Sequence, residues 1–266
     1  MLAIANMRRK KYMKPNYKNW MPKGMVCGFL AAAVIAALIT VVVGVAGIIG
    51  KIFLIITILL AIMTIWMFLM YRAFSYNGSR QMSRQIIEGV SSYVKIPDGG
   101  KGLDVGCGSG ALTIASARKN PNAQIIGIDR WGKEYASFSK TLCETNAEAE
   151  GVTNVSFEQG DATKLGFEDE TFDAVTSNYV YHNIPSKDRQ AILLETLRTL
   201  KKGGTFAIHD IMSKSKYGDM ESFAQKLKDL GYEDVRLIDT TSGMFMNKFE
   251  ATWMGLSGST ILLGKK

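Results

Sequence analysis

The stretch Gly102-Leu103-Asp104-Val105-Gly106-Cys107-Gly108-Ser109-Gly110 decides the fold class of this chain. Four residues typical of a short buried strand run into a turn with a glycine at every second position. Glycine permits a sharp turn and a close approach of the backbone to a ligand, because it has no Cβ. A helix is predicted from Ala111 to about Lys119. A strand, a glycine-rich turn and a helix in this order are typical of a ligand-binding loop in an α/β sheet.

Strand and helix patterns alternate from this loop to the end of the chain. Further strands are predicted at 124–129, 155–159, 172–177, 205–209, 235–239 and 260–263. Helices are predicted at 133–150, 187–201 and 219–230, and an amphipathic helix within 78–94 precedes the first strand. This alternation predicts an α/β fold with a doubly wound, mostly parallel, seven-stranded Rossmann-like sheet.

The N-terminal third has a different composition. Residues 25–50 and 52–71 carry no charge, and Lys51 lies between them. Because roughly 20 helical residues cross a hydrocarbon core of ~30 Å, two transmembrane helices are predicted at about 25–45 and 52–71. Gly44, Gly47 and Gly50 mark the turn of this hairpin. A signal peptide has a single apolar region of about 7–15 residues and does not fit, whereas a buried helical hairpin is the alternative.

Basic residues predict the orientation of the hairpin. Residues 1–24 hold seven basic side chains and no acid, and Arg72, Arg80 and Arg84 follow the second run. Positive residues stay on the cytoplasmic side, so both ends of the chain are expected there, at a cell membrane. The arm should also attract anionic headgroups. We therefore divide the chain into a basic cytoplasmic arm at 1–24, a hairpin at 25–72 and a catalytic domain at 73–266.

Charge and cysteine usage argue against nucleic acid and metal as partners. Residues 73–266 hold 23 basic and 24 acidic side chains, a net charge of −1, so the formal +8 of the whole chain belongs to the first 72 residues. A nearly neutral domain is not expected to bind nucleic acid. Cys27, Cys107 and Cys143 form no CxxC pair and no zinc-ligand spacing, so no metal site is predicted. Three widely spaced cysteines fit a reducing compartment.

The glycine loop, with an acid two residues before its first glycine, resembles the first motif of class I S-adenosylmethionine-dependent methyltransferases. Other motifs of that family follow in its order: Asp129 ending the second strand, Gly160-Asp161-Ala162, the strand from Phe172 to Asn178, and the turn from Leu200 to Thr205. The resemblance covers about 80–266 and is closest to the group of quinone-biosynthesis and other small-molecule methyltransferases. A nicotinamide-dependent dehydrogenase would carry GxGxxG instead, and Asp104 would disfavour its pyrophosphate.

The resemblance implies S-adenosylmethionine as the cofactor and gives roles to particular residues. In the family the glycine loop cradles the methionine part, the Asp129 position binds both ribose hydroxyls, and the Asp161 position bonds the adenine amine. The expected cofactor-binding residues are Asp104, Gly106, Cys107, Gly108, Gly110, Asp129, Arg130, Asp161, Ala162 and Asn178.

The segment after the fourth strand, 178–185, lies where this fold places residues that face the methyl acceptor. An acceptor held in line at about 3–3.5 Å needs little further help, although a general base assists when it must lose a proton. His182 is the first candidate for base or orienting group, with Tyr179 and Tyr181 beside it, and His209 is a weaker candidate. The methionine-rich stretch 244–256 reads either as a core helix or as a lid over an apolar acceptor.

These features together predict a membrane-anchored methyltransferase that acts on a small hydrophobic or lipid-like acceptor. Two alternatives remain open at this stage. The acceptor could belong to a membrane protein, or the chain could be an anchored scaffold that binds the cofactor without turnover.

Overall fold

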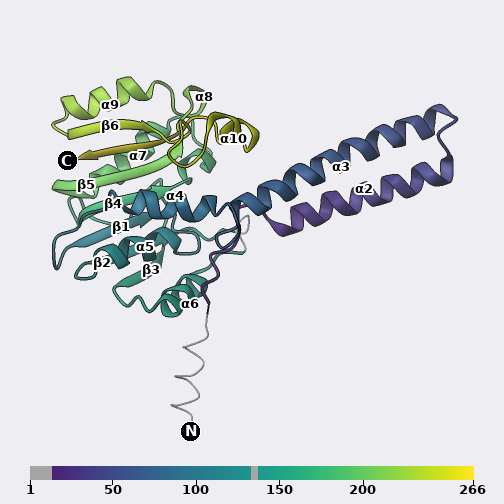
Figure 1. Cartoon of the computed structure of the whole chain (residues 1–266). Coiled ribbons are helices and arrows are strands. Elements are labelled where there is room, and N and C mark those ends of the chain that lie inside the picture. Colours follow the sequence, from purple (N-terminus) through teal and green to yellow (C-terminus); the bar gives the residue numbers. More distant parts are fainter. Residues whose placement is uncertain (1–13, 133–136) are drawn as a thin grey trace, which may run out of the picture. The chain divides into compact units, whose positions relative to one another are not determined.

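The computed structural model describes residues 14–132 and 137–266 (Figure 1). Within them the chain forms two compact units. One is Lys18–Arg84, and the other joins Gln85–Lys266 to the segment that ends at Tyr17. The basic residues Arg8, Arg9, Lys10 and Lys11, and the first part of the helix expected at 133–150, lie outside the described residues.

Two long apolar helices make up most of the first unit. Helix α2 is Lys23–Val43 and α3 is Ile48–Phe74, so both begin earlier than the uncharged runs suggest, and α3 extends through Arg72. Gly44, at φ 76°, ends α2. A Cβ on Gly50 would lie 1.6 Å from the Gly44 carbonyl oxygen, so only glycine permits this tight turn. The glycines therefore do form the turn of the hairpin.

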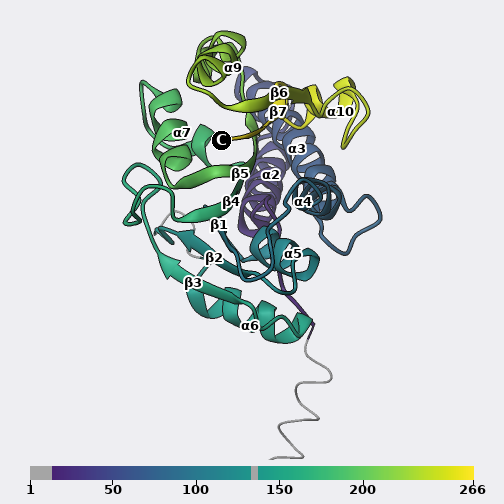
Figure 2. The same cartoon turned by 90° about the vertical axis from the view of Figure 1, so that its left-hand side faces the viewer.

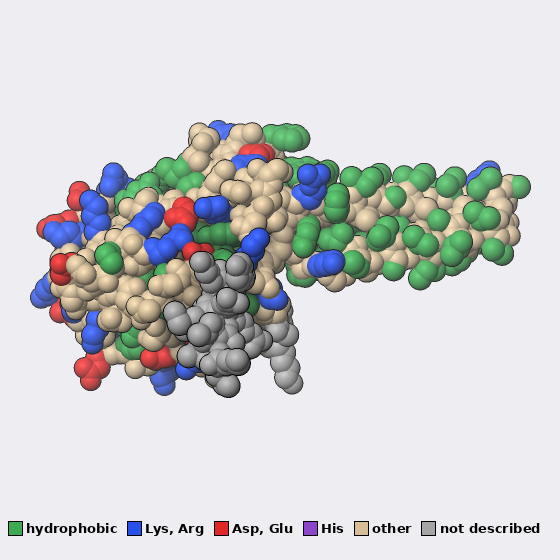
Figure 3. Space-filling model, turned by 60° about the horizontal axis from the view of Figure 1, so that its bottom comes forward, with side chains coloured by type: hydrophobic (Ala, Val, Ile, Leu, Met, Phe, Trp, Pro, Cys, Tyr) green, Lys and Arg blue, Asp and Glu red, His purple; other side chains and the backbone are tan. Residues whose placement is uncertain are grey.

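Many large apolar side chains of this helix pair are exposed. Val41, Val42 and Ile48 are 79%, 86% and 76% exposed. Hydrophobic side chains cover the visible face of the pair in Figure 3, where no acidic side chain is seen. Thr40 and Thr57 donate their hydroxyls to the carbonyls of Ala36 and Phe53 one turn earlier, which satisfies them inside the helices. Both helices are long and apolar enough to cross a membrane by length and composition.

A seven-stranded sheet forms the centre of the second unit. Its strands are β1 Lys101–Val105, β2 Gln124–Asp129, β3 Val155–Gln159, β4 Phe172–Asn178, β5 Leu200–Ile211, β6 Glu233–Asp239 and β7 Ser259–Lys265. Their order is β3-β2-β1-β4-β5-β7-β6. Strands β1 to β5 run parallel, and β7 is antiparallel to both β5 and β6. The predicted fold class, with a mostly parallel seven-stranded sheet, is confirmed.

Strand β5 is longer than the sequence pattern predicts. The stretch Leu200 to Gly204, expected as a turn, belongs to the strand, and Leu200 pairs with Phe172. The register then shifts before Thr205 pairs with Ala174, and Gly203 has φ 79°. Because glycine tolerates this irregular backbone, the strand continues through the expected turn.

Helices cover both faces of the sheet (Figure 2). On one face lie α5 Ala111–Lys119 and α6 Lys140–Glu150, and on the other α7 Arg189–Arg198 and α9 Met220–Asp229. Helix α4, Met82–Ser91, crosses the boundary of the units, and its Gly89 packs against the Phe245 ring. Helix α6 begins at Lys140 because Ser139 caps it, accepting from the Leu142 N–H. The short helices are η2 Tyr181–Asn183, α8 Lys214–Tyr217 and α10 Lys248–Trp253.

Candidate active site

The carboxyl ends of β1 and β4 lie side by side, since Val105 pairs with Ser177. The glycine loop leaves β1 at this edge with positive φ at Gly106 (75°), Gly108 (57°) and Gly110 (82°). A Cβ on Gly106 would lie 2.2 Å from the Val180 side chain, so the loop and the segment after β4 touch only because this residue is glycine. The cofactor-side and acceptor-side segments expected from the sequence are therefore in contact.

Asp104 lies beneath the glycine loop rather than in front of it. It is 1% exposed, and its two oxygens accept the hydroxyls of Thr113 (2.6 Å) and Thr176 (3.0 Å). Burial raises the pKa of its carboxyl to about 7, against the opposing effect of these bonds. The side chain therefore links β1, β4 and the start of α5, and acts on a ligand only through the loop.

Asp129, at the end of β2, holds the loop from the other side. Its Oδ2 accepts the Gly108 N–H at 2.8 Å, and its Oδ1 accepts the Trp131 N–H at 2.8 Å. The Trp131 indole in turn donates to the Gly108 carbonyl at 3.0 Å. Trp131 is not among the residues predicted from the sequence, although it follows the strand-end acid Asp129 by two positions.

Two buried thiols lie behind the same loop. Cys143 on α6 donates to the Gly108 carbonyl at 3.2 Å, and Cys107 is 7% exposed. Burial, with Cys143 nearby, raises the pKa of the Cys107 thiol well above its ordinary value, so this group stays protonated. Cys107 therefore supports the loop as a packed neutral side chain.

Asp161 follows β3, and one of its two oxygens makes no hydrogen bond to the part of the chain that the structure describes. Its Oδ1 accepts the N–H and hydroxyl of Thr163 at 2.8 and 2.7 Å, and these bonds lower the pKa of the carboxyl. No bond to Oδ2 is found among residues 14–132 and 137–266. Ala162 packs against the core, and Arg130 is exposed, its charge also lowering the Asp161 pKa. This edge can thus receive a donor from a ligand.

His182 and Asp210 form a pair beyond β4. The His182 Nδ1 lies 2.5 Å from Asp210 Oδ1, and the His182 backbone N–H donates to Oδ2 at 3.1 Å. Tyr217 donates its hydroxyl to the same Oδ2 at 2.8 Å. Burial raises the Asp210 pKa, but the bonds from His182 and Tyr217 outweigh it, so the pKa is lowered and the group is a carboxylate. A carboxylate at Nδ1 leaves His182 Nε2 as the basic nitrogen.

A single guanidinium fixes the segment that carries His182. Arg189, at the start of α7, donates only to backbone carbonyls among its hydrogen bonds here. These belong to Tyr181 (3.1 Å), Ser186 (3.1 Å), Ile184 (3.0 Å), Lys216 (3.0 Å) and His182 (3.4 Å). Its five donors suit this task, which a lysine could not perform. No local pattern in the sequence indicated this role.

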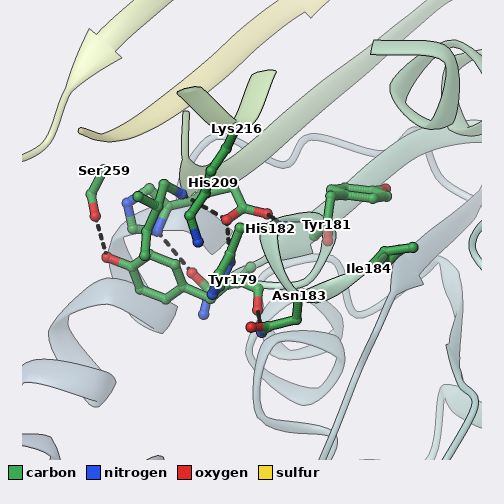
Figure 4. A network of polar contacts seen from close by, with 12 residues as sticks. Tyr179, Tyr181, His182, Asn183, Ile184, His209, Lys216 and Ser259 are labelled. Carbon is green, nitrogen blue, oxygen red and sulfur yellow. Dashed lines mark hydrogen bonds and ion pairs between the residues drawn. The ribbon is translucent and has the colours of Figure 1, made fainter. Parts of the chain in front are cut away.

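Tyr179 and Tyr181 point away from each other (Figure 4). Ser259 already donates its hydroxyl to Leu256, so Tyr179 donates to Ser259 Oγ at 2.8 Å. Tyr181 is fully buried in the core and bonds Thr196 at 2.8 Å. Burial raises the pKa of both phenols, so they stay protonated. Tyr181 thus supports the segment from inside the core. The ring of Tyr179 packs against that of His209, with ring centroids 4.6 Å apart.

His209 is a buried neutral residue. His209 Nδ1 lies 2.8 Å from Asn178 Oδ1, which can only accept, so Nδ1 carries the proton and donates it. His209 Nε2 faces the Thr240 hydroxyl at 3.0 Å, and that hydroxyl also lies 2.9 Å from the Ser259 carbonyl. Burial lowers the His209 pKa to about 3. The residue connects β4, β5 and the Thr240 turn without reaching outward.

The methionine-rich stretch 244–256 contains both core residues and exposed residues, so it combines features of a core helix and of a lid. Met246, Ala251 and Met254 are buried, whereas Met244 and Phe249 are 45% and 78% exposed. Phe245 packs on His209 with ring centroids 5.6 Å apart. Most of the stretch is therefore core, with α10 presenting one aromatic side chain to its surroundings.

A family model described as a methyltransferase domain matches residues 96–252, which is more than half of the chain. The chain belongs to the methyltransferase domain family. The demethylmenaquinone methyltransferase of Staphylococcus carnosus (strain TM300) is 35% identical over 117 residues, 43% of this chain and 44% of that protein. That of Staphylococcus aureus (strain JH9) is 39% identical over 108 residues, 40% of this chain and 41% of that protein. The matches thus span less than half the length of these curated relatives.

Solved structures agree on the fold of this chain. A geranyl diphosphate methyltransferase in complex with GPP and sinefungin has a TM-score of 0.55 at 13% identity, covering 73% of this chain and 81% of that one. The [4+2]-cyclase SpnF has a TM-score of 0.53 at 21% identity, covering 71% and 84%. Because a cyclase is among them, the fold by itself does not fix the reaction. The fold and the S-adenosylmethionine-dependent family predicted from the sequence are confirmed.

The residues at this edge of the sheet fit the cofactor of the family. A Cβ on Gly108 would project into open space beside the loop, which leaves room for a ligand against the backbone. The Asp129 carboxylate accepts two N–H groups and has further lone pairs for hydroxyls, and Asp161 Oδ2 can accept from an amine. The N-terminus of α5, at Ala111, carries the partial positive charge that favours a carboxylate.

Proposed function

We propose that this methyltransferase transfers the methyl group of S-adenosylmethionine to a small apolar acceptor that loses a proton from a hydroxyl group, such as a quinol-like ring. The observation that carries the proposal is the His182–Asp210 pair, held on a segment that touches the glycine loop through Val180 and Gly106. A scaffold that only bound the cofactor would have no use for a buried carboxylate aligned on a partly exposed imidazole.

The cofactor would lie across the carboxyl ends of β1 to β3. Gly106, Gly108 and the start of α5 would hold its amino-acid part, Asp129 its ribose and Asp161 its adenine. Bound S-adenosylmethionine supplies a methyl group already activated by its sulfonium. Asp104 and Asn178 act one layer back, since each is engaged in bonds to other side chains.

His182 would take the acceptor's proton. Its Nε2 receives the proton, and the Asp210 carboxylate at Nδ1 stabilises the imidazolium that forms. Tyr217 and the Ile211 N–H hold Asp210 in place, at 2.8 and 2.6 Å. Loss of the hydroxyl proton makes the acceptor oxygen, and the ring carbon beside it, electron-rich enough to take the methyl. Where the ring carbon takes the methyl, that carbon releases its own hydrogen as a proton and the hydroxyl is restored. Tyr179 and Tyr181 take no part in the proton transfer, because their hydroxyls are bonded to Ser259 and Thr196.

The class of acceptor is supported by two observations. The relatives that match are demethylmenaquinone methyltransferases. The aromatic ring of Phe249 is 78% exposed. Phe245, four residues earlier on the same segment, packs on His209. Both favour a ring-containing apolar acceptor over a polar metabolite.

The helices α2 and α3 would anchor the enzyme in a cell membrane. Their outward-facing apolar side chains have no favourable contact with water, and a bilayer removes that cost. Six basic residues before α2 and Lys23 at its start, with Arg72, Arg80 and Arg84 at and after the end of α3, favour a cytoplasmic catalytic domain, with the arm near anionic headgroups. An acceptor dissolved in the membrane would then lie in the same compartment as the enzyme.

The full-length protein in lipid nanodiscs tests the proposal. Calorimetry with S-adenosylmethionine measures cofactor binding, and methyl-labelled cofactor measures transfer to a demethylated quinol, to phospholipid and to membrane protein. Transfer to the quinol that is lost in His182→Gln supports the proposal. Binding without transfer to any acceptor would instead indicate a scaffold, and transfer to protein alone would indicate a protein methyltransferase.

Cysteine labelling in intact cells tests the orientation. A single cysteine introduced at Lys10, in a background that lacks the three native cysteines, should react only after the membrane is permeabilised. Labelling from outside would place the arm on the opposite side and contradict the proposed topology.

A further inference from the structure

The chain segment just before the apolar helices is bonded to the glycine loop. We name Asn16 and Tyr17 the strap. They lie 130 and 92 positions away in sequence from Asn146 and Ser109, the residues that they contact. Only residues 18–22 separate the strap from Lys23, where α2 begins. None of the motifs read from the sequence involves the strap.

Asn146 on α6 joins the strap to the loop. Its Oδ1 accepts the Asn16 N–H at 2.7 Å, and its Nδ2 donates to the Asn16 carbonyl at 3.2 Å. The same Nδ2 donates to the Ser109 carbonyl at 2.9 Å. Asn146 is fully buried, so its side-chain amide cannot exchange these partners for water. The Asn146 side chain thus bonds both the N–H and the carbonyl of Asn16, as a neighbouring strand does, and it also bonds the glycine loop at Ser109.

Ser109 makes a second, direct connection. Its hydroxyl donates to the Tyr17 carbonyl at 2.9 Å, and the residue is 6% exposed. Ser109 stands between Gly108 and Gly110, both of which have positive φ. A fixed Ser109 therefore restricts the two glycines, which would otherwise visit many conformations.

The Tyr17 side chain makes a third attachment. It is 5% exposed, and its hydroxyl donates to Glu150 at 3.2 Å. Glu150, at the end of α6, is itself paired with Arg118 of α5 at 2.8 Å. The strap is thus bound to both helices that flank the loop.

We infer that the strap is a working part of the cofactor site, with Tyr17 and Asn146 as positioning residues for the glycine loop. By bonding Asn146 and Ser109, the strap holds the loop in the conformation that receives S-adenosylmethionine, so cofactor affinity depends on a segment continuous with the membrane helices. The inference rests on the proposed cofactor. Its physical basis is preorganisation, since a loop ordered before binding loses less entropy when the ligand arrives.

Two pairs of variants in the full-length protein test this coupling. Asn16→Pro removes the N–H that bonds Asn146, whereas the control Asn16→Ala keeps the whole backbone of this exposed residue. Asn146→Leu removes all three side-chain bonds, whereas Thr145→Ala changes a half-buried neighbour on the same helix. We expect Asn16→Pro and Asn146→Leu to raise the Kd and KM for S-adenosylmethionine about tenfold, the equivalent of one to two hydrogen bonds. The kcat at saturating cofactor should stay within about twofold, and the control variants should bind like the wild type.

Hydrogen exchange gives a readout that does not depend on turnover. Amides of 106–110 should exchange faster in Asn16→Pro than in Asn16→Ala, without cofactor. Equal Kd values and equal exchange in Asn16→Pro and Asn16→Ala would overturn the inference, even if Asn146→Leu failed to fold. If the wild-type protein did not bind S-adenosylmethionine at all, the proposed function would fail instead, and the exchange comparison would still decide whether the strap orders the loop.

Discussion

The Nδ1 of His182 lies 2.5 Å from the Oδ1 of Asp210, and the carboxylate of Asp210 is fully buried. This pair connects the segment after β4 to the end of β5, across 28 positions of sequence. Buried charges of this kind are stable only when their lone pairs are filled, and here Tyr217 and two backbone N–H groups fill them. The arrangement gives His182 one defined tautomer, from which the first predictions follow.

Replacing His182 by Gln should lower kcat by about 10²-fold or more, within the range that a general base contributes. The Kd for S-adenosylmethionine should not change, because His182 makes no bond to the glycine loop. Single-turnover transfer to a quinol and calorimetry measure the two quantities. Asn183→Ala, an exposed neighbour, serves as the control. A kcat near that of the wild type would exclude His182 as the base.

Replacing Tyr217 by Phe should lower kcat by roughly 3–10-fold, since one hydrogen bond of about 1 kcal/mol to Asp210 is lost. The pKa of Asp210 should rise, because that bond favours the carboxylate form. The acidic limb of the pH–rate profile should then move toward higher pH. Tyr232→Phe, on the half-buried ring that packs against Phe206, is the matched control. An unchanged pH–rate profile would show that Tyr217 only fills space.

Replacing Asp161 by Ala should raise the Kd for S-adenosylmethionine by about tenfold or more, because a bond to a charged group contributes roughly 1.5–3 kcal/mol. The variant also loses the turn bonds to Thr163. Thr163→Val removes the hydroxyl bond but keeps the free Asp161 oxygen, so it separates the two effects. Calorimetry should find Thr163→Val close to the wild type. Equal losses in both variants would mean that Asp161 serves the turn and not the cofactor.

His209 and Asp104 should give opposite pH dependences of stability. The His209 pKa falls from 6.5 to about 3 on folding, so its contribution is fully present above pH 6.5 and is lost as the pH falls below that value. The Asp104 pKa rises from 3.8 to about 7, so its contribution is present at low pH and is lost as the pH rises toward 7. Between about pH 4 and 6.5 the two effects oppose each other in the wild type.

Thermal melting of His209→Gln and Asp104→Asn separates these effects. When the pH is lowered from 6.5 to 5, the wild type should lose about 1.4 kcal/mol of stability per pH unit through His209, and the Gln variant should not. At about 2–4 °C per kcal/mol, the Tm of His209→Gln should therefore rise by roughly 4–8 °C relative to that of the wild type. For Asp104→Asn the direction is opposite: its Tm should rise relative to that of the wild type as the pH is raised from 5 to 7. Parallel Tm curves for all three proteins would contradict both assignments.

The sequence by itself determined the elements whose cause is local. Glycines at 106, 108 and 110 predicted the loop after β1, because positive φ is decided residue by residue. The two uncharged runs predicted α2 and α3, and the glycines between them predicted the turn. The order of strands and helices predicted the parallel sheet, since short connections and helix-length crossovers leave few other topologies. The cofactor-binding residues that the sequence predicts rest on motifs of the same local kind.

Only the tertiary structure decided which side chains meet. Asp104 turns beneath the loop because Thr113 and Thr176 from two other elements offer it hydroxyls, and its own neighbours do not reveal this. Asp210 reaches His182 because β4 and β5 are paired with Asn178 beside His209, a register fixed by the whole sheet. Asn16 meets Asn146 because α6 brings its buried face to the loop. Backbone conformation is set within a few residues, whereas the pairing of polar side chains depends on strand order, helix rotation and burial, which the entire chain determines together.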